Sequence, residues 1–182
     1  PCQRCAEACP PKCIDFSMPL TSQATRNVSS IIVATGYETM DPSPLTQYGY
    51  GTHPDILTAM EFERLLTSAG PTGGDIVRPS DGKHPKNIVF VLCVGSRDRK
   101  AYRYCSRFCC MYSIKHAFQA IDHGVKDVTV LYMDVRAYGK GFDAFWKRTE
   151  QEGAKFLRGE PSRISADGDR IRQIVINLIS NA

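Results

Sequence analysis

The cysteines of this chain are concentrated in two short segments. They are Cys2, Cys5, Cys9 and Cys13 in the first, and Cys93, Cys105, Cys109 and Cys110 in the second. A disulfide scaffold spreads its cysteines through a chain too small for a core, whereas clustered thiols without a secretion signal favour metal in a reducing compartment. The sequence therefore predicts thiolate-bound metal and a cytoplasmic protein.

The second cysteine group follows the strongest strand pattern in the sequence. Residues 87–93, Asn-Ile-Val-Phe-Val-Leu-Cys, are apolar almost throughout, as in a parallel strand covered on both faces. Further along, a helix is expected over 106–123, a strand over 128–133, a helix over 142–152 and a strand over 155–158. This alternation predicts an α/β fold with a Rossmann-like parallel sheet.

In such a sheet, ligands bind beyond the carboxyl end of a strand, near the amino terminus of the next helix. A dinucleotide-binding turn would have G-x-G-x-x-G there, but this chain has Cys-Val-Gly-Ser-Arg-Asp at 93–98. We therefore expect metal in place of a nucleotide. Cys93 would join Cys105 and Cys109, four residues apart on one helix face, and Cys110.

Spacing alone does not choose the metal. Structural zinc sites usually have two C-x-x-C knuckles, and the second cysteine group lacks them, which favours a 4Fe-4S cluster. An interaction module stabilised by four-thiolate zinc, without redox activity, is the alternative. Buried structural cysteines with no metal would explain one or two of the four.

Cys2, Cys5 and Cys9, followed by Pro10, match the last three cysteines of the bacterial ferredoxin pattern C-x2-C-x2-C-x3-C-P. Residues 1–16 are therefore expected to be a ferredoxin-like remnant, in which these three cysteines ligate a 4Fe-4S cluster whose first cysteine precedes the chain. In the alternative, Cys13 completes a local set of four.

Two further segments have clear local patterns. The apolar run Ile-Ile-Val-Ala-Thr-Gly at 31–36 predicts a buried strand that ends in a tight turn. A helix is expected after Thr58, with Glu61 as the acid of a capping box and Gly70 at its end.

The net charge of +4 is modest and acidic residues are interspersed, so no nucleic-acid partner is expected. No apolar stretch is long enough to span a membrane.

Several motifs occur in the same order as in the A subunit of heterodisulfide reductase. They are Cys-Pro-Pro-Lys-Cys-Ile-Asp-Phe at 9–16, Ile-Ile-Val-Ala-Thr-Gly-Tyr at 31–37, Cys-Val-Gly-Ser-Arg-Asp at 93–98 and Tyr-Cys-Ser-Arg-Phe-Cys-Cys at 104–110. Residues 1–160 thus resemble that family of iron-sulfur flavoproteins. The resemblance implies that residues 17–160 are part of a thioredoxin-reductase-like FAD/NAD(P)-binding domain, with FAD near Ala34, Thr35 and Gly36.

The same resemblance implies electron transfer, often with flavin-based bifurcation, in organisms that carry out methanogenesis. Expected partners are other heterodisulfide-reductase-type subunits, a hydrogenase or formate dehydrogenase, and ferredoxin. No catalytic acid–base residue is expected. The family's own G-x-G-x-x-G, which holds the FAD pyrophosphate, does not occur in this chain, so we expect the chain to bind FAD poorly by itself.

The last segment, 165–182, resembles the N-box helix of sensor histidine kinases, in which Asn177 and Asn181 would face ATP. A fragment of an ATP-binding histidine kinase is therefore a third hypothesis. The apolar residues alone predict an amphipathic helix of uncertain origin over 161–182.

Overall fold

A computed structural model describes residues 2–165 and 173–176 of the chain. The chain divides into two compact units, 1–35 and 36–182. Residues 17–35 pair with no strand of the sheet, and the domain boundary predicted after residue 16 stays a prediction. The two units are separate bodies.

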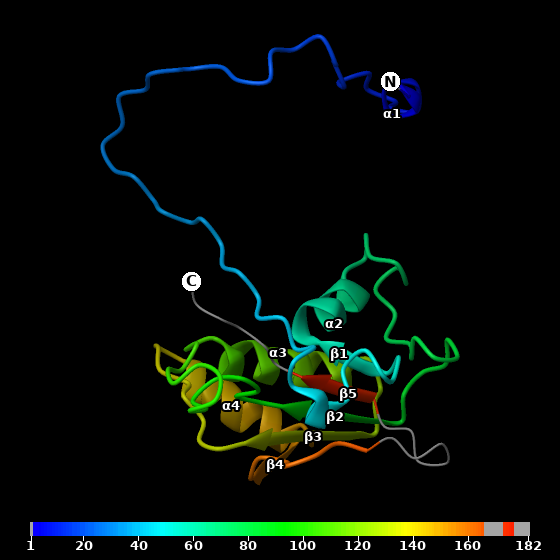
Figure 1. Cartoon of the computed structure of the whole chain (residues 1–182), viewed down its shortest axis with the longest axis vertical. Helices are drawn as coiled ribbons and strands as arrows, with labels where there is room; N and C mark the ends of the chain where they lie inside the picture. Colours follow the sequence, from blue (N-terminus) through cyan, green and yellow to red (C-terminus); the bar gives the residue numbers. More distant parts are fainter. Residues whose placement is uncertain (1, 166–172, 177–182) are drawn as a thin grey trace. The chain divides into compact units, whose positions relative to one another are not determined.

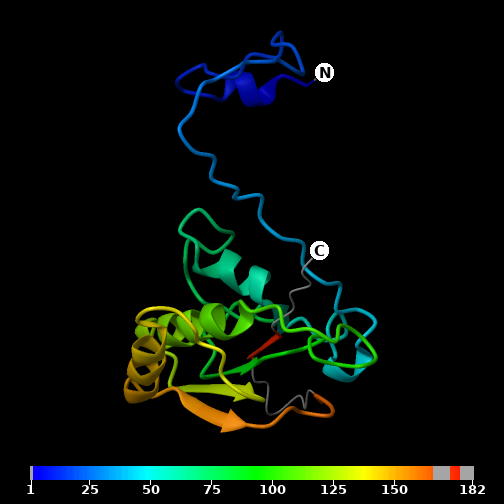
Figure 2. The same cartoon turned by 90° about the vertical axis from the view of Figure 1, so that its left-hand side faces the viewer.

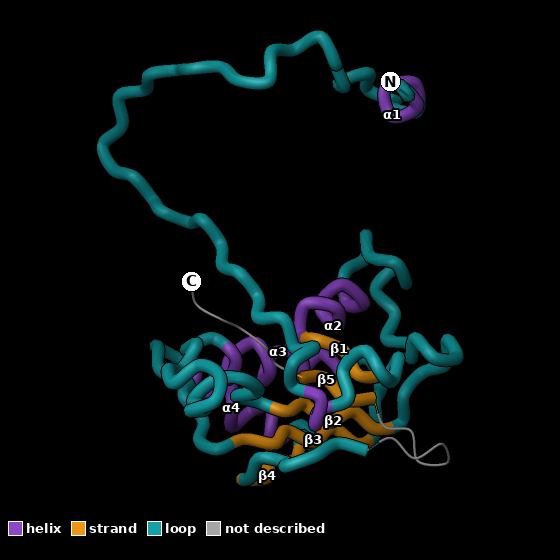
Figure 3. Tube along the Cα trace, viewed as in Figure 1, coloured by secondary structure: helices purple, strands orange, loops and turns teal. Residues whose placement is uncertain are grey.

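In the first unit, helix α1 (Arg4–Glu7) is followed by a long segment in loop conformation (Figure 3). The buried strand predicted at 31–36 is wrong: Ile31, Ile32 and Val33 are 80%, 90% and 79% exposed. Strand residues need neighbours to bond their backbone groups, and no described strand pairs with this run.

The second unit is built on a five-stranded, all-parallel sheet (Figure 1). Its strands, in the spatial order β1-β5-β2-β3-β4, are β1 (Ile56–Thr58), β5 (Gln173–Ile176), β2 (Asn87–Val91), β3 (Asp127–Tyr132) and β4 (Lys155–Arg158). The predicted α/β fold with a Rossmann-like parallel sheet is confirmed.

Two helices cover one side of β2 and β3. Helix α3 (Cys109–Asp122) contacts both strands, and α4 (Phe142–Gln151) packs against α3 (Figure 2). The core is densest under α3, where Phe90 and Ile114 are fully buried. Among the residues that the structure describes, no helix has the length and apolar content to cross a membrane.

The loop before β1 is irregular, as its prolines predict, and contains the 3-10 helix η1 (Thr46–Tyr48). Tyr48 is buried at 6% exposure, and its hydroxyl donates to Glu160 Oε1 at 3.1 Å. This contact ties the loop to the segment that follows β4.

Helix α2 (Ala59–Leu66) begins with the predicted capping box. The Glu61 amide donates to Thr58 Oγ1 at 3.2 Å, and the Thr58 amide donates to Glu61 Oε2 at 2.7 Å. The helix ends at Leu66, before the predicted stop at Gly70. A helix amino terminus satisfied in this way is stable without a ligand.

Thr58→Ala is expected to lower the free energy of unfolding by about 1 kcal/mol, because the α2 amide loses its side-chain acceptor. Urea unfolding followed by circular dichroism measures this. Ser68→Ala removes an exposed hydroxyl just beyond the same helix and should cost less than about 0.5 kcal/mol. Equal costs for the two variants would contradict the role of the cap.

The helix predicted over 161–182 is wrong at Gln173–Ile176, which forms strand β5. Ile174 pairs in parallel with Ile56 of β1 on one side and with Val89 of β2 on the other. Two neighbouring strands offer this segment backbone partners, and a run of β-branched residues suits a strand. Asn177 and Asn181 lie outside the described residues.

Candidate metal centre

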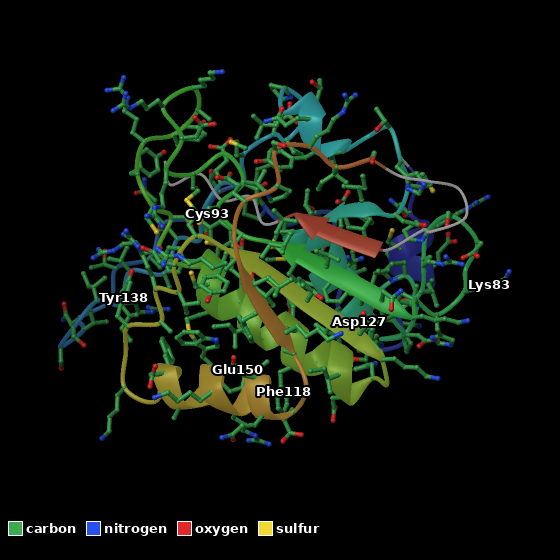
Figure 4. The ribbon with its side chains drawn as sticks, turned by 90° about the horizontal axis from the view of Figure 1, so that it is seen from below. Lys83, Cys93, Phe118, Asp127, Tyr138 and Glu150 are labelled. Atoms are coloured by element: carbon green, nitrogen blue, oxygen red, sulfur yellow. The ribbon has the colours of Figure 1, made fainter. Side chains whose placement is uncertain are left out.

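The second cysteine group lies where β2 ends and α3 begins. Cys93 follows β2, and Cys109 and Cys110 open α3. These three are 3% exposed, whereas Cys105 in the intervening loop is half-buried. Figure 4 places Cys93 at one end of the sheet and Lys83 and Asp127 at the other. The cysteines therefore occupy the carboxyl edge, as parallel-sheet topology predicts.

The Cys109 thiol interacts with the thiols of Cys93 and Cys110, and Cys105 interacts electrostatically with Cys110. Within residues 2–165 and 173–176, no three Cys, His, Asp or Glu side chains already form a group that could hold a metal ion.

The expectation that Cys105 and Cys109 share a helix face is wrong. Helix α3 starts at Cys109, and Arg107 just before it has φ 68°. A left-handed backbone interrupts a right-handed helix. Cys105 therefore lies in the loop before the helix and not on its face.

Several residues other than glycine in the cysteine-bearing loops have a left-handed backbone conformation. Cys93, Arg97 and Arg107 have φ of 63°, 61° and 68°. Such values are uncommon for residues other than glycine and cost about 1–2 kcal/mol each. Backbone strain of this kind clusters at functional sites, so its position here supports a site at the thiols.

Several N–H groups point at the sulfurs. The Arg107 amide donates to Cys105 Sγ and the Arg136 amide donates to Cys110 Sγ, both at 3.3 Å. The Arg97 guanidinium pairs with Asp134 and is also hydrogen-bonded to Cys93. Donors of this kind stabilise negative sulfur and tune the potential of a bound cluster.

The thiols favour negative charge at the start of α3. Hydrogen bonds from Cys110 and Cys93 lower the pKa of Cys109, and the same hydrogen bonds together with burial raise the pKa values of Cys93 and Cys110. Helix α3 has no side-chain hydrogen bond at its N-cap Phe108, and the amino terminus of a helix favours negative charge. Four thiols, N–H donors and an uncapped helix fit an iron-sulfur cluster.

The first cysteine group lies in the other unit. Cys9 and Cys13 have their sulfur atoms 3.5 Å apart, while Cys2 and Cys5 are exposed. Cys5 is part of α1. Ligation by Cys2, Cys5 and Cys9 stays a prediction.

A pocket of about 250 Å³ lies along α3, which begins at Cys109. It is lined by Tyr37, Ala59, Met60, Glu63, Tyr112, Lys115 and His116. Tyr37 stacks on Phe108, the residue before α3, at 6.3 Å between ring centroids. Of the three residues predicted at the FAD, Ala34 and Thr35 lie in the first unit, and Gly36 (φ 77°) directly precedes Tyr37.

The polar wall of this pocket was not predicted from sequence. Glu63 Oε2 accepts from Lys115 Nζ at 2.6 Å and also pairs with His116 Nε2. His116 is 2% exposed, and its Nδ1 has no partner among the described atoms. Burial lowers the pKa of His116, so the neutral imidazole donates its Nε2–H to the carboxylate.

Glu63 should make folding stability depend on acid pH. Burial raises its pKa, but hydrogen bonds from Lys115 and His116 outweigh burial and set it below the ordinary 4.5. The contribution of the ionised Glu63 carboxylate to folding stability is present above pH 4.5 and is lost as the pH falls through the lowered pKa of Glu63. Glu63→Gln should therefore cost about 0.5 kcal/mol at neutral pH, a small value because Glu63 is partly exposed, and less near pH 3.

Urea unfolding of both proteins at the two pH values measures this difference. Glu150→Gln, an exposed carboxylate of α4, is the matched control and should change stability little at either pH. A cost for Glu63→Gln that grows on acidification would contradict the direction of the pKa shift.

No protein-family model matches the chain. The A subunit of the H2:CoB-CoM heterodisulfide, ferredoxin reductase of Methanothermobacter thermautotrophicus is 49% identical over 146 residues, which are 78% of this chain and 22% of the relative. The iron-sulfur A subunit of the CoB-CoM heterodisulfide reductase of Methanocaldococcus jannaschii is 42% identical over 177 residues, 96% of this chain and 27% of the relative. The A subunit of a ferredoxin/F420H2-dependent CoB-CoM heterodisulfide reductase from Methanosarcina acetivorans is 39% identical over 170 residues, which are 92% of this chain and 21% of the relative.

The chain thus spans about a quarter of the length of these curated relatives. The match to the Methanocaldococcus protein covers 96% of 182 residues and so leaves about 7 unmatched.

Proposed function

Most of this chain belongs to the family of the heterodisulfide reductase A subunit, and we propose from this that it is an electron-transfer segment of an iron-sulfur flavoprotein oxidoreductase. The observation that carries the proposal is the gathering of Cys93, Cys105, Cys109 and Cys110 at the carboxyl edge of the sheet, with N–H donors on the sulfurs. Disulfide-reducing activity and bifurcation would belong to the complete protein.

Cys93, Cys105, Cys109 and Cys110 would hold the central 4Fe-4S cluster, and Cys2, Cys5 and Cys9 would contribute to a second one. A bound cluster supplies one-electron transfer. The chain supplies the rest: burial of three of the central thiols keeps water out, and the Arg107 and Arg136 amides hold negative charge on sulfur.

We further propose that FAD binds near Ala34, Thr35 and Gly36 in the complete protein. Within the second unit, the pocket lined by Tyr37 and Tyr112 lies along α3, which begins at Cys109. Lys115 would supply positive charge to an anionic ligand in this pocket, while Glu63 holds the Lys115 ammonium in place. The FAD pyrophosphate would need residues from elsewhere in the complete protein.

The names of the relatives link those proteins to H2, formate, ferredoxin and F420H2. For this chain we propose three kinds of partner: other heterodisulfide-reductase-type subunits, a hydrogenase or formate dehydrogenase, and ferredoxin. We further propose that the chain works in the cytoplasm of a cell with methanogen-type metabolism.

Iron and acid-labile sulfide in anaerobically purified protein test the proposal. We expect a brown protein whose broad visible absorbance bleaches with dithionite. A colourless protein with stoichiometric zinc would replace the proposal with the zinc-stabilised module.

A further inference from the structure

The loop between β2 and α3 has a concentrated positive charge. Residues 97–107 contain five basic residues and one acidic residue, so their formal charge of +4 equals that of the entire chain. Beyond β3, the loop 133–141 adds Arg136 and Lys140 against the single acid Asp134. Outside these two loops the formal charge of the chain is about neutral.

The two loops form one surface. Arg97 pairs with Asp134, and the Arg107 guanidinium lies 5.3 Å from the ring centroid of Tyr138. The Arg136 amide donates to Cys110, which ties the second loop to the thiols. Figure 4 shows Cys93 and Tyr138 at the same end of the unit. The positive charge therefore lies at the same end of the unit as the candidate metal centre.

Aromatic side chains are exposed on the same surface. Tyr102, Tyr104, Phe108 and Tyr138 are 36%, 42%, 53% and 52% exposed. Arginine and tyrosine are the residues most enriched in protein interfaces and their hot spots. We call the exposed side chains of 97–108 and 136–140 the arginine–tyrosine surface.

Part of its charge is not neutralised within the chain. Arg97 and Arg136 share Asp134, whereas Arg99, Lys100 and Lys140 form no ion pair in the described part of the chain, and all three are exposed. If these charges stabilised the folded chain, their side chains would form ion pairs with acidic residues. Their positive field is instead directed outward.

We propose that the arginine–tyrosine surface docks an acidic, one-electron carrier protein over the metal centre, an inference that rests on the proposed function. Half-buried Cys105 lies within the surface, so a docked protein would come close to the centre. One electron leaves the reduced carrier and one enters the centre, with no proton or bond exchanged. The positive field accelerates encounter with an acidic partner and orients it.

The test compares two charge-reversed proteins made in the full chain. The triple variant R99E/K100E/K140E reverses three exposed residues that lie at least five positions from any thiol. The matched control K83E/K86E/K126E makes the same change in net charge, and Figure 4 shows Lys83 at the opposite end of the sheet from Cys93. Comparison of the two variants therefore separates the effect of net charge on binding from the effect of charges on the docking surface itself.

Binding of a bacterial-type ferredoxin of net negative charge is measured by titration calorimetry under anaerobic conditions. We expect R99E/K100E/K140E to weaken binding about tenfold or more and the control to stay within about twofold. Salt near 1 M, where the Debye length is about 3 Å, should weaken binding to the unaltered chain. Equal losses in both triple variants would overturn the proposal.

Two further measurements complete the test. Duplex DNA is titrated in parallel, and affinity for DNA equal to that for ferredoxin would identify a general polyanion surface and overturn the proposal. Iron and sulfide are determined on every sample, so absence of the cluster counts against the proposed function alone. Ferredoxin binding still reports on the surface in that case.

Discussion

Replacing Cys109 with serine should empty the central metal centre. Anaerobically prepared Cys109→Ser protein is expected to lose about four iron and about four sulfide per chain relative to the unaltered protein. Cys109 has the largest effect because its sulfur contacts both Cys93 and Cys110 and lies at the uncapped start of α3. A hydroxyl is a poor ligand for iron where a thiolate is needed.

Iron and sulfide analysis with visible absorbance measures the loss, and Cys13→Ser is the control. Cys13 is exposed and lies in the other unit, so its replacement should leave the central cluster in place. Loss of a cluster in Cys13→Ser would instead support the local set of four in the first group. Unchanged iron in Cys109→Ser would exclude the central site.

Phe90→Ala is expected to lower the free energy of unfolding by about 3–5 kcal/mol. Phe90 is fully buried in β2, with its ring edge-on to Phe62 of α2 at 5.5 Å and 6.3 Å from His116 of α3. Truncation leaves a cavity where these three elements meet. The free energy of unfolding of a domain is about 5–15 kcal/mol, so this substitution would remove a large part of it.

Urea unfolding of the metal-free chain measures this cost without a contribution from bound iron. Leu157→Ala in β4 is the control, because its side chain is 54% exposed and should cost less than about 1 kcal/mol. Similar costs at the two positions would mean that the core is not centred on β2. Phe90→Ala should also bind iron less well, since Phe90 positions β2, the strand that Cys93 follows.

The sequence predicted the long periodic elements of the second unit well and the short or isolated ones poorly. Strand β2 and helix α3 were evident because burial on both faces of a strand and on one face of a helix leaves a clear pattern. Strand β1 has three residues, too few for any pattern. The run 31–36 looked like a strand because apolar content does not reveal whether a neighbouring strand exists.

Strand β5 was mistaken for a helix for a related reason. Its isoleucines and valine fit a spacing of three and four residues as well as they fit a buried strand, and only the open position between β1 and β2 decides between them. That position is a property of the whole sheet.

The place of the cysteines in the candidate metal centre followed from topology, but the details of their surroundings did not. Residues after a parallel strand and at the start of the next helix must share one edge of the sheet, so Cys93 and Cys109 were predicted together. The interruption of the helix at Arg107 depends on a backbone angle that arginine rarely adopts. The Glu63–His116 pair joins two helices distant in sequence, and no local pattern indicates it.

With the proposed cluster bound, the left-handed backbone at Cys93 would couple the lifetime of the protein to iron supply. A newly made chain would hold the strained Cys93 before any metal binds, so the metal-free protein would unfold more readily than the metal-bound protein and would be the better substrate for proteases. Starvation for iron would then lower the amount of this protein in a cell without any change in its synthesis.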